Sequence, residues 1–277
     1  MAADDDQAVQ ARLSKVFTTV KAWRTRTEMP QPEPEPGSSL AGDDQATSPL
    51  HVSHAVVGVL VSAVDHFETV RLVVQEQHVL PARGGFTLLR AALENAAAAV
   101  WLLGPSDRQD RVFRQLRWEW ANVNDGNNIF KLMGEMSEDE THAADVKAQV
   151  ETLRKAQKTR LQDLARAHGM TPARVGDVIA NPDGFGRIVE TAGDHARGLT
   201  GKHAKWAWMT CSGLAHSRRW TEFAFLEKEV MPGATDDVGV AKIGATEEHL
   251  AAMAEVAAQM LTEAWRLFDE RRGSLIG

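Results

Sequence analysis

One stretch in the first half of the chain carries apolar side chains on nearly every side of a helix. It covers residues 85–103 and includes four consecutive alanines, which let neighbouring backbones approach closely. A helix without a polar face must be surrounded by other elements, so the pattern predicts a central core helix. Only Arg90, Glu94 and Asn95 interrupt it, and Arg90 and Glu94 lie one turn apart on the same side. Buried charges require partners, which makes these two residues the first candidates for a functional site.

The rest of the pattern is also helical. Apolar residues recur at steps of three and four along each long segment between breaks that contain proline or glycine. The predicted helices cover residues 7–27, 50–79, 85–103, 107–129, 138–168, 202–227 and 246–272, with a short helix from Thr171. No strand-like alternation of convincing length occurs, although a short hairpin within 231–244 stays open. The sequence therefore predicts an all-α helical bundle.

A proline-rich segment separates the first predicted helix from the others. Residues 29–39 alternate proline with polar residues, which favours extended polyproline geometry and cannot form a core. We therefore expect an N-terminal helical arm at 1–28, a linker at 29–47 and an all-helical bundle domain at 48–277. Ser48 and Pro49 predict the first helix start of that domain. The arm docks either on the same chain or on a second subunit.

Composition and charge narrow the functional classes. The 277 residues carry a formal net charge of −7, so the chain has no global basic footprint for nucleic acid. The single cysteine, Cys211, excludes an internal disulfide framework and fits a reducing compartment. The acidic start lacks the features of a signal peptide, and Arg90 and Glu94 interrupt the one long apolar stretch. We expect a cytoplasmic protein without a membrane segment.

A second set of polar groups lies in the helix predicted at 202–227. One seam of this helix holds Trp206, Met209, Gly213, His216, Trp220 and Phe223. Trp208, Ser212 and His216 follow one another at steps of four and point roughly the same way. A buried histidine that serves packing is one explanation, and a functional polar site is the other. If the two helices pack together, we expect one hydrogen-bonded cluster with these four members: Arg90, Glu94, Ser212 and His216.

These residues carry a resemblance to a known family. The order Trp208-x-x-x-Ser212-x-x-x-His216 resembles the Tyr-x-x-x-Ser-x-x-x-His signature of a large bacterial family of all-helical proteins, which are similar to HEPN (higher eukaryotes and prokaryotes nucleotide-binding) domains. Arg90-x-x-x-Glu94 resembles the family's Arg-x-x-x-Glu helix, and Trp208 stands where the family usually has tyrosine. The resemblance implies an HEPN-like bundle that forms homodimers. It also implies a binding or regulatory role, in a defence or toxin–antitoxin setting.

Two other functions remain open. HEPN ribonucleases share an Arg-x(4–6)-His motif, so the resemblance offers a metal-independent RNase as an alternative. The candidate pair with compatible spacing is Arg197 and His203, but Gly198 stands where a polar residue is usual. Ser212, not arginine, stands four residues before His216, which counts further against a nuclease. The third reading is a helical-bundle enzyme or sensor that binds a small molecule at the four-residue cluster.

The remaining motifs predict neither a metal nor a cofactor. The sequence has no Cys-x-x-Cys, no Gly-rich phosphate loop and no pair of Glu-x-x-His motifs. Four arginines recur every three residues, at Arg108, Arg111, Arg114 and Arg117. They form either a solvated face or a track for anions or RNA. The expected partners are a second copy of the chain and RNA or a nucleotide.

Overall fold

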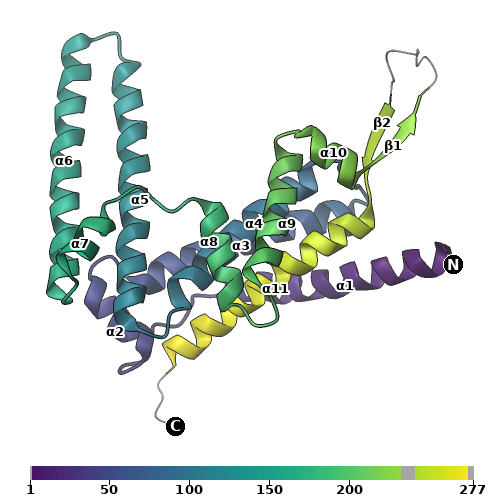
Figure 1. Cartoon of the computed structure of the whole chain (residues 1–277), viewed down its shortest axis with the longest axis horizontal. Coiled ribbons are helices and arrows are strands. Elements are labelled where there is room, and N and C mark those ends of the chain that lie inside the picture. The colour runs from purple at the N-terminus through teal and green to yellow at the C-terminus, as the bar shows by residue number, and fades with distance from the viewer. Residues whose placement is uncertain (1, 232–240, 274–277) are drawn as a thin grey trace. The chain divides into compact units, whose positions relative to one another are not determined.

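The computed structural model describes residues 2–231 and 241–273, and over these residues the prediction of an all-α fold is confirmed (Figure 1). Helices account for nearly all of the regular structure, because the described strands form only one short antiparallel pair. In chain order the elements are α1 (Ala2–Thr27), α2 (Ser39–Thr47), α3 (Val52–Arg71), the π-helical turn η1 (Leu72–Glu76), α4 (Gly84–Leu103), α5 (Arg108–Glu135), α6 (Glu140–Ala167), α7 (Pro172–Val178), α8 (Phe185–His195), α9 (Gly201–Ala215), α10 (Arg219–Phe225), β1 (Leu226–Val230), β2 (Ala241–Ala245) and α11 (Glu247–Arg272).

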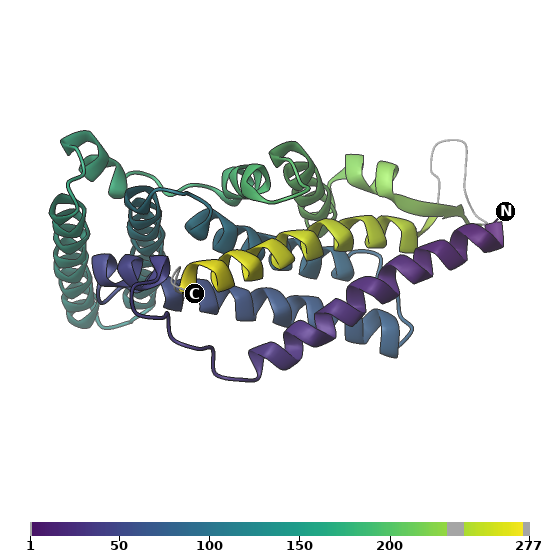
Figure 2. The same cartoon turned by 90° about the horizontal axis from the view of Figure 1, so that it is seen from below.

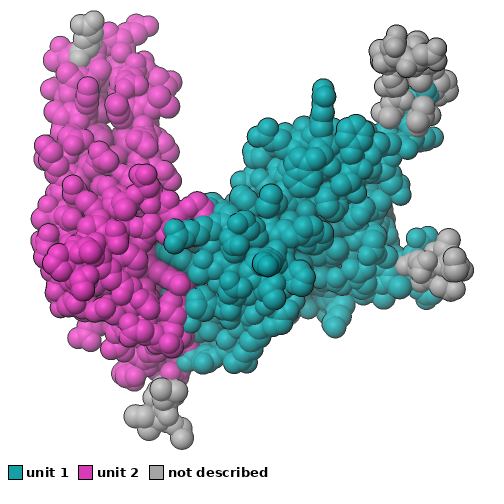
Figure 3. All heavy atoms as spheres, in the orientation of Figure 1, with its two compact units in different colours: residues 1–33, 56–104, 185–270 teal, residues 34–55, 105–184, 271–277 magenta. Residues whose placement is uncertain are grey.

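The chain divides into two compact units, each built from separate stretches of sequence (Figure 3). Unit 1 comprises residues 1–33, 56–104 and 185–270, and unit 2 comprises residues 34–55, 105–184 and 271–277. The consecutive division into arm, linker and bundle at 1–28, 29–47 and 48–277 stays a prediction. Each unit has its own buried apolar residues and is described separately below.

Helix α4 is the core helix of unit 1, as its all-round apolar pattern predicts. Every residue from Ala96 to Leu103 is buried, together with Phe86, Leu89 and Leu93. Helices α8 and α9 pack against it. Among the described helices, α4 alone is long and apolar enough to cross a membrane, and 67% of its most apolar window is buried within the fold. Burial in a protein core accounts for that apolar character.

Helix α1 belongs to the core of unit 1 and docks on its own chain. Its apolar stripe is buried, with Leu13, Phe17 and Val20 almost inaccessible to solvent. Helix α1 also forms ion pairs with α11, through Arg12 with Glu255 and Arg26 with Asp269. Figure 2 shows the two helices running along each other. The open question of where the N-terminal helix docks is therefore answered within one chain.

Unit 2 is organised around the long hairpin of α5 and α6. Its core combines the N-terminal part of α5 and the C-terminal part of α6 with α2 and α7. The buried apolar residues are Ala46, Val112, Leu116, Trp120, Leu161, Ala165, Met170, Val175 and Val178. Helix α2 occupies Ser39–Thr47, where the sequence predicted a linker. The hydroxyl of Ser38 caps it by accepting a hydrogen bond from the Ala41 amide, and Leu40 and Asp43 are fully buried. The cap is a local signal that the prediction missed, whereas the contact of Asp43 with Arg111 joins residues 68 positions apart.

The prediction of one helix over 202–227 is wrong beyond Ala215. Helix α9 ends there, and Ser217 adopts a positive φ of 50°. The amide of Arg218 donates to the carbonyl of Gly213 at 2.8 Å, and the amide of Ser217 donates to the carbonyl of Leu214 at 3.2 Å. This pattern is a Schellman C-cap, with serine in the place that glycine usually takes. The chain then reverses into α10, and β1 and β2 form the short hairpin that the sequence left open.

Candidate functional site

Four side chains from α4 and α9 form a hydrogen-bonded cluster in unit 1. The Arg90 Nε donates to Glu94 Oε1 at 2.8 Å, and its Nη1 lies 2.9 Å from His216 Nε2. The indole Nε1 of Trp208 donates to the same Glu94 oxygen at 2.7 Å. Below, "the Arg90 cluster" means Arg90, Glu94, Trp208 and His216.

Helical periodicity explains how the cluster forms. Arg90 and Glu94 lie one turn apart on the face of α4 that packs against α9, and Trp208 lies two turns before the C-cap residue His216. Sequence reasoning named Trp208 for its steps of four to Ser212 and His216 and as a replacement for tyrosine, but did not include it in the expected cluster. Its indole N–H supplies a donor to Glu94, which a tyrosine hydroxyl could equally supply. The step of four from Trp208 to Ser212 to His216 was the signal that could have placed it in the cluster.

Ser212 does not join these hydrogen bonds. In the part of the chain that the structure describes, its carbonyl accepts from the His216 amide at 3.1 Å, but its hydroxyl has no hydrogen-bond partner. The structure thus brings together Arg90, Glu94 and His216 from the expected set and leaves Ser212 beside them.

The Arg90 cluster reaches the protein surface. The side chain of Arg90 is 25% exposed, that of Glu94 is 14% exposed, and His216 is exposed. A guanidinium has five N–H groups, and Arg90 uses two of them within the described residues. Three N–H groups therefore remain for solvent or a ligand.

The contact with Arg90 occupies one ring nitrogen of His216. Arginine has donors only, so Nε2 of His216 accepts this hydrogen bond with its lone pair.

Exposed aromatic side chains also lie on α9, which carries Trp208, and on α10, which follows it. The apolar seam predicted on residues 202–227 does not enter the core, because Trp206, Met209, Trp220 and Phe223 are 46–71% exposed. The turn at Ser217 moves Trp220 and Phe223 onto α10. The rings of Trp206 and Trp220 both pack near Phe225, at centroid distances of 6.2 and 6.4 Å. Two exposed arginines, Arg218 and Arg219, directly precede Trp220 in the sequence.

The alternative nuclease pair lies elsewhere in unit 1. Arg197 is in the exposed loop before α9, where its carbonyl accepts from Gln259 Nε2 at 2.9 Å. His203 is exposed in the first turn of α9, and its amide donates to Thr200 Oγ1 at 3.3 Å. Neither Arg197 nor His203 uses its side chain in a hydrogen bond within the described ranges. No contact joins the two side chains there, so the structure provides no assembled Arg–His pair at this position.

The arginine repeat of α5 does not form one solvated face or one open track. Arg108 is exposed, with 54% of its side chain accessible, and it pairs with Asp43 at 3.2 Å. Arg111 is 2% exposed and pairs with the same carboxylate, and Arg117 pairs with Asp183 at 3.0 Å. Burial lowers the pKa of Arg114. Both sequence interpretations are therefore wrong for Arg111 and Arg117, because α2 and the segment after α7 supply internal acceptors that only the fold brings near.

A reactive thiol and a metal site are two other kinds of site to consider. Cys211 is buried in α9, and its burial raises the pKa of the thiol to about 12. Within residues 2–231 and 241–273, no group of three or more His, Cys, Asp or Glu side chains is placed to hold a metal ion. Neither observation adds a reactive group to the Arg90 cluster.

Comparisons with protein-family models, with curated proteins and with solved structures give no match. The resemblance of Trp208, Ser212 and His216 to the HEPN signature therefore stays a prediction. The functional proposal has to be carried by the geometry of the Arg90 cluster and the surface beside it.

Proposed function

We propose that this chain is an HEPN-like binding or regulatory module that takes RNA or a nucleotide at the Arg90 cluster. The observation that carries the proposal is the state of Arg90. Its guanidinium is held in place by Glu94 and His216, yet it keeps three N–H groups without a partner among the described residues. A planar donor fork of this kind matches the oxygens of a phosphate.

The neighbouring surface supplies the other half of such a ligand site. The exposed rings of Trp206, Trp220 and Phe223 offer flat faces on which bases can stack. Glu94 neutralises Arg90 locally, so the positive charge that attracts a phosphate comes mainly from Arg218 and Arg219. The combination of cations and exposed aromatic rings is typical of surfaces that bind single-stranded nucleic acid.

Binding without cleavage is the better supported reading of the cluster. A general base needs a free lone pair within reach of the substrate. The Nε2 lone pair of His216 accepts from Arg90, and the Glu94 oxygen nearest the site accepts from both Arg90 and Trp208. A metal-independent RNase remains the second candidate, favoured by the exposure of His216 directly beside an arginine. It requires His216 to leave Arg90 when RNA arrives.

Fluorescence anisotropy with a labelled single-stranded RNA and with ATP as competitor tests the proposal. We expect Arg90→Gln to weaken binding about tenfold or more, because charge-assisted hydrogen bonds to phosphate are lost. Arg24→Gln, at an exposed arginine of α1 that pairs with Glu28, is the matched control and leaves binding unchanged. A folded wild-type protein that binds neither probe would contradict the proposal. Metal-independent RNA cleavage that His216→Gln abolishes would favour the RNase.

We also propose that the chain forms a homodimer through the α5–α6 hairpin. The end of α5 carries an apolar stripe of Ile129, Leu132, Met133 and Met136, each 59–78% exposed. These residues share the face opposite Gly134, the residue that contacts Val146 of α6. A stripe at helical spacing that no element of unit 2 covers suits another helix.

The charge distribution favours a second copy of the chain as the source of the helix that covers this stripe. Residues 121–151, around the tip of the hairpin, contain seven acids and two bases, whereas residues 152–167 contain five bases and one acid. An antiparallel second hairpin would therefore set acidic against basic segments. We expect size-exclusion chromatography with light scattering to give twice the chain mass of 30.4 kDa, and Leu132→Glu with Met133→Glu to give the monomer. Met29→Glu, at another exposed methionine, is the control. A monomeric wild type would refute the dimer.

A further inference from the structure

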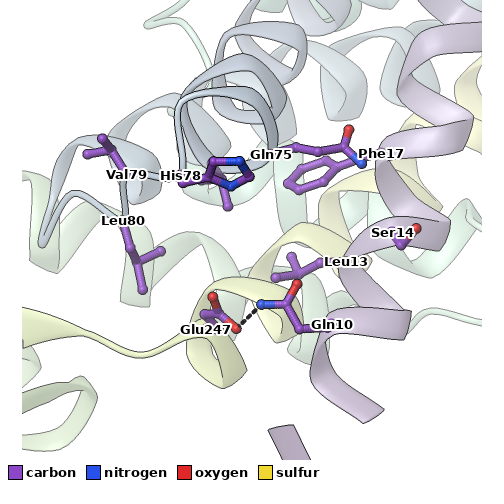
Figure 4. A pocket seen from close by; sticks show the side chains of 10 residues that line it. Gln10, Leu13, Ser14, Phe17, Gln75, His78, Val79, Leu80 and Glu247 are labelled. Atoms are coloured by element: carbon purple, nitrogen blue, oxygen red, sulfur yellow. Dashed lines mark hydrogen bonds between the residues drawn. The ribbon is translucent and has the colours of Figure 1, made fainter. Parts of the chain in front are cut away.

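A cavity of about 260 Å³ lies in unit 1, away from the Arg90 cluster. It is enclosed by α1, by η1 with the segment after it, and by the first turn of α11, as Figure 4 shows. Leu13 and Phe17 form an apolar floor, and both are almost fully buried. Gln10, His78 and Glu247 place polar groups around its edge. An apolar pocket with a few converging polar groups is the usual form of a small-molecule site, and this one is just below the size range for drug-sized ligands.

The backbone that forms one wall is irregular. Helix α3 widens into the π-helical turn η1, in which the Gln77 amide donates to the Leu72 carbonyl at 3.0 Å. His78 follows with a positive φ of 53°, a region that non-glycine residues rarely occupy. Single π-helical turns and strained residues both gather at functional sites. Here the two irregularities coincide, and they bring His78 and Leu80 to the cavity.

The charge of the lining indicates the chemistry of the ligand. Among the described residues that line the cavity, Glu247 alone carries a carboxylate, and none is an arginine or lysine. In the described part of the chain its side chain is hydrogen-bonded only to the amide of Gln10. The next residue, Glu248, instead pairs with Arg12 at 2.8 Å. The position at the start of α11 stabilises either carboxylate. Only Glu247, however, adds an uncompensated negative charge to an apolar cavity.

We propose that this cavity binds a small organic ammonium. The protonated amine lies against the Glu247 carboxylate, and the apolar body of the ligand packs on Leu13 and Phe17. The side-chain oxygen of Gln10 and the imidazole of His78 are placed to accept the remaining hydrogen bonds of the ammonium group. This site is independent of the RNA or nucleotide site proposed above.

Isothermal titration calorimetry on the full chain tests the proposal, with 2-phenylethylamine as the probe. The neutral analogue 2-phenylethanol has the same apolar body. We expect saturable binding of the amine, and binding at least about tenfold weaker for the alcohol, because the charge-assisted hydrogen bond is absent. We expect Glu247→Gln to weaken binding of the amine by the same factor of about ten or more, and Glu248→Gln to leave it unchanged.

A third variant separates the cavity from a surface carboxylate. Ser14 is exposed at the rim of the cavity, so Ser14→Trp fills the space without removing a core side chain, and it abolishes binding of the amine. Circular dichroism confirms that each variant is folded before titration. The proposal is overturned if the wild type shows no saturable binding of 2-phenylethylamine, if the alcohol binds equally well, or if the folded Ser14→Trp variant binds as the wild type does.

Discussion

Arg111 in unit 2 and Arg90 in unit 1 are both surrounded by apolar helices, but their guanidinium groups are used differently. All five N–H groups of Arg111 have acceptors: both oxygens of Asp43 at 2.5 and 2.9 Å, the carbonyls of Pro105 and Ser106, and the hydroxyl of Ser39. Arg90 has acceptors for two of its five, and a quarter of its side chain is exposed. A buried arginine whose five N–H groups all have acceptors has no donor left for a ligand. An arginine that is fixed in place but keeps N–H groups without acceptors can still bind one.

Arg111 and Arg90 illustrate two different roles that an arginine can have on a helix that packs into a core. Arg111 joins α5 to α2 and to the turn before α5, so its hydrogen bonds hold unit 2 together. Arg90 is positioned by α4 and α9, and its remaining donors point to a role outside the core. The need for partners does not distinguish the two, since both guanidinium groups have them. The number of donors left without acceptors does.

The largest effect is expected when Arg111 is removed. Arg111→Met leaves the buried carboxylate of Asp43 without its bidentate partner, so we expect the free energy of unfolding to fall by about 3–5 kcal/mol. Urea denaturation measures this loss. Replacing both partners, as Arg111→Met with Asp43→Leu, removes the stranded charge and recovers part of the loss. A loss below about 1 kcal/mol for the single variant would show that this pair is not the structural link that its geometry indicates.

A smaller loss of stability and a larger loss of function are expected at Arg90. Arg90→Met is expected to lower the free energy of unfolding by about 1 kcal/mol, because the site reaches the surface and solvent partly screens its ion pair. Affinity for labelled RNA is expected to fall about tenfold or more. Loss of several kcal/mol with unchanged RNA affinity would make Arg90 a second structural arginine and remove the contrast with Arg111.

The next effect concerns the indole that helps to hold Glu94. Trp208→Phe removes the donor to Glu94 and keeps the aromatic ring, so we expect about 1 kcal/mol less stability. Trp208→Tyr restores a donor and is expected to lose less than Trp208→Phe. A thermal-unfolding comparison of the two variants measures the difference. Equal losses would show that the hydrogen bond contributes nothing beyond the packing of the ring.

The smallest effect is a pH dependence at Cys211, which lies on α9 beside the cluster. Burial is the largest cause that raises the pKa of its thiol to about 12, and the positive charge of Arg90 acts in the opposite direction. The thiol of the unfolded chain ionises at a lower pH. Stability from the neutral thiol is therefore complete below the unfolded pKa and declines as the pH rises towards about 12. Denaturation of the wild type and Cys211→Ala from pH 8 to 10 tests the sign, since only the wild type should show this decline.

Sequence reasoning reached the interior of unit 1 but not that of unit 2. The six alanines of residues 85–103 and their apolar neighbours allowed only a helix packed on all sides, and α4 is that helix. Its charges needed partners, and His216 was named from its spacing on another helix. In unit 2 the same reasoning took the arginines of α5 for a surface feature, because Asp43 and Asp183 lie more than 60 residues away in sequence. Local spacing cannot reveal acceptors at that distance.

The sequence by itself determined most of the long helices, because helical periodicity, N-caps and proline or glycine breaks act over a few residues. It also determined that Arg90 and Glu94 share one face of a buried helix. Only the tertiary structure decided which donors of Arg90 and Arg111 find acceptors, and that α9 ends at Ala215, before Trp220 and Phe223, which stay exposed. These outcomes depend on contacts between segments far apart in the chain. A hydrogen bond or a reversed turn forms there only when packing brings the groups within reach.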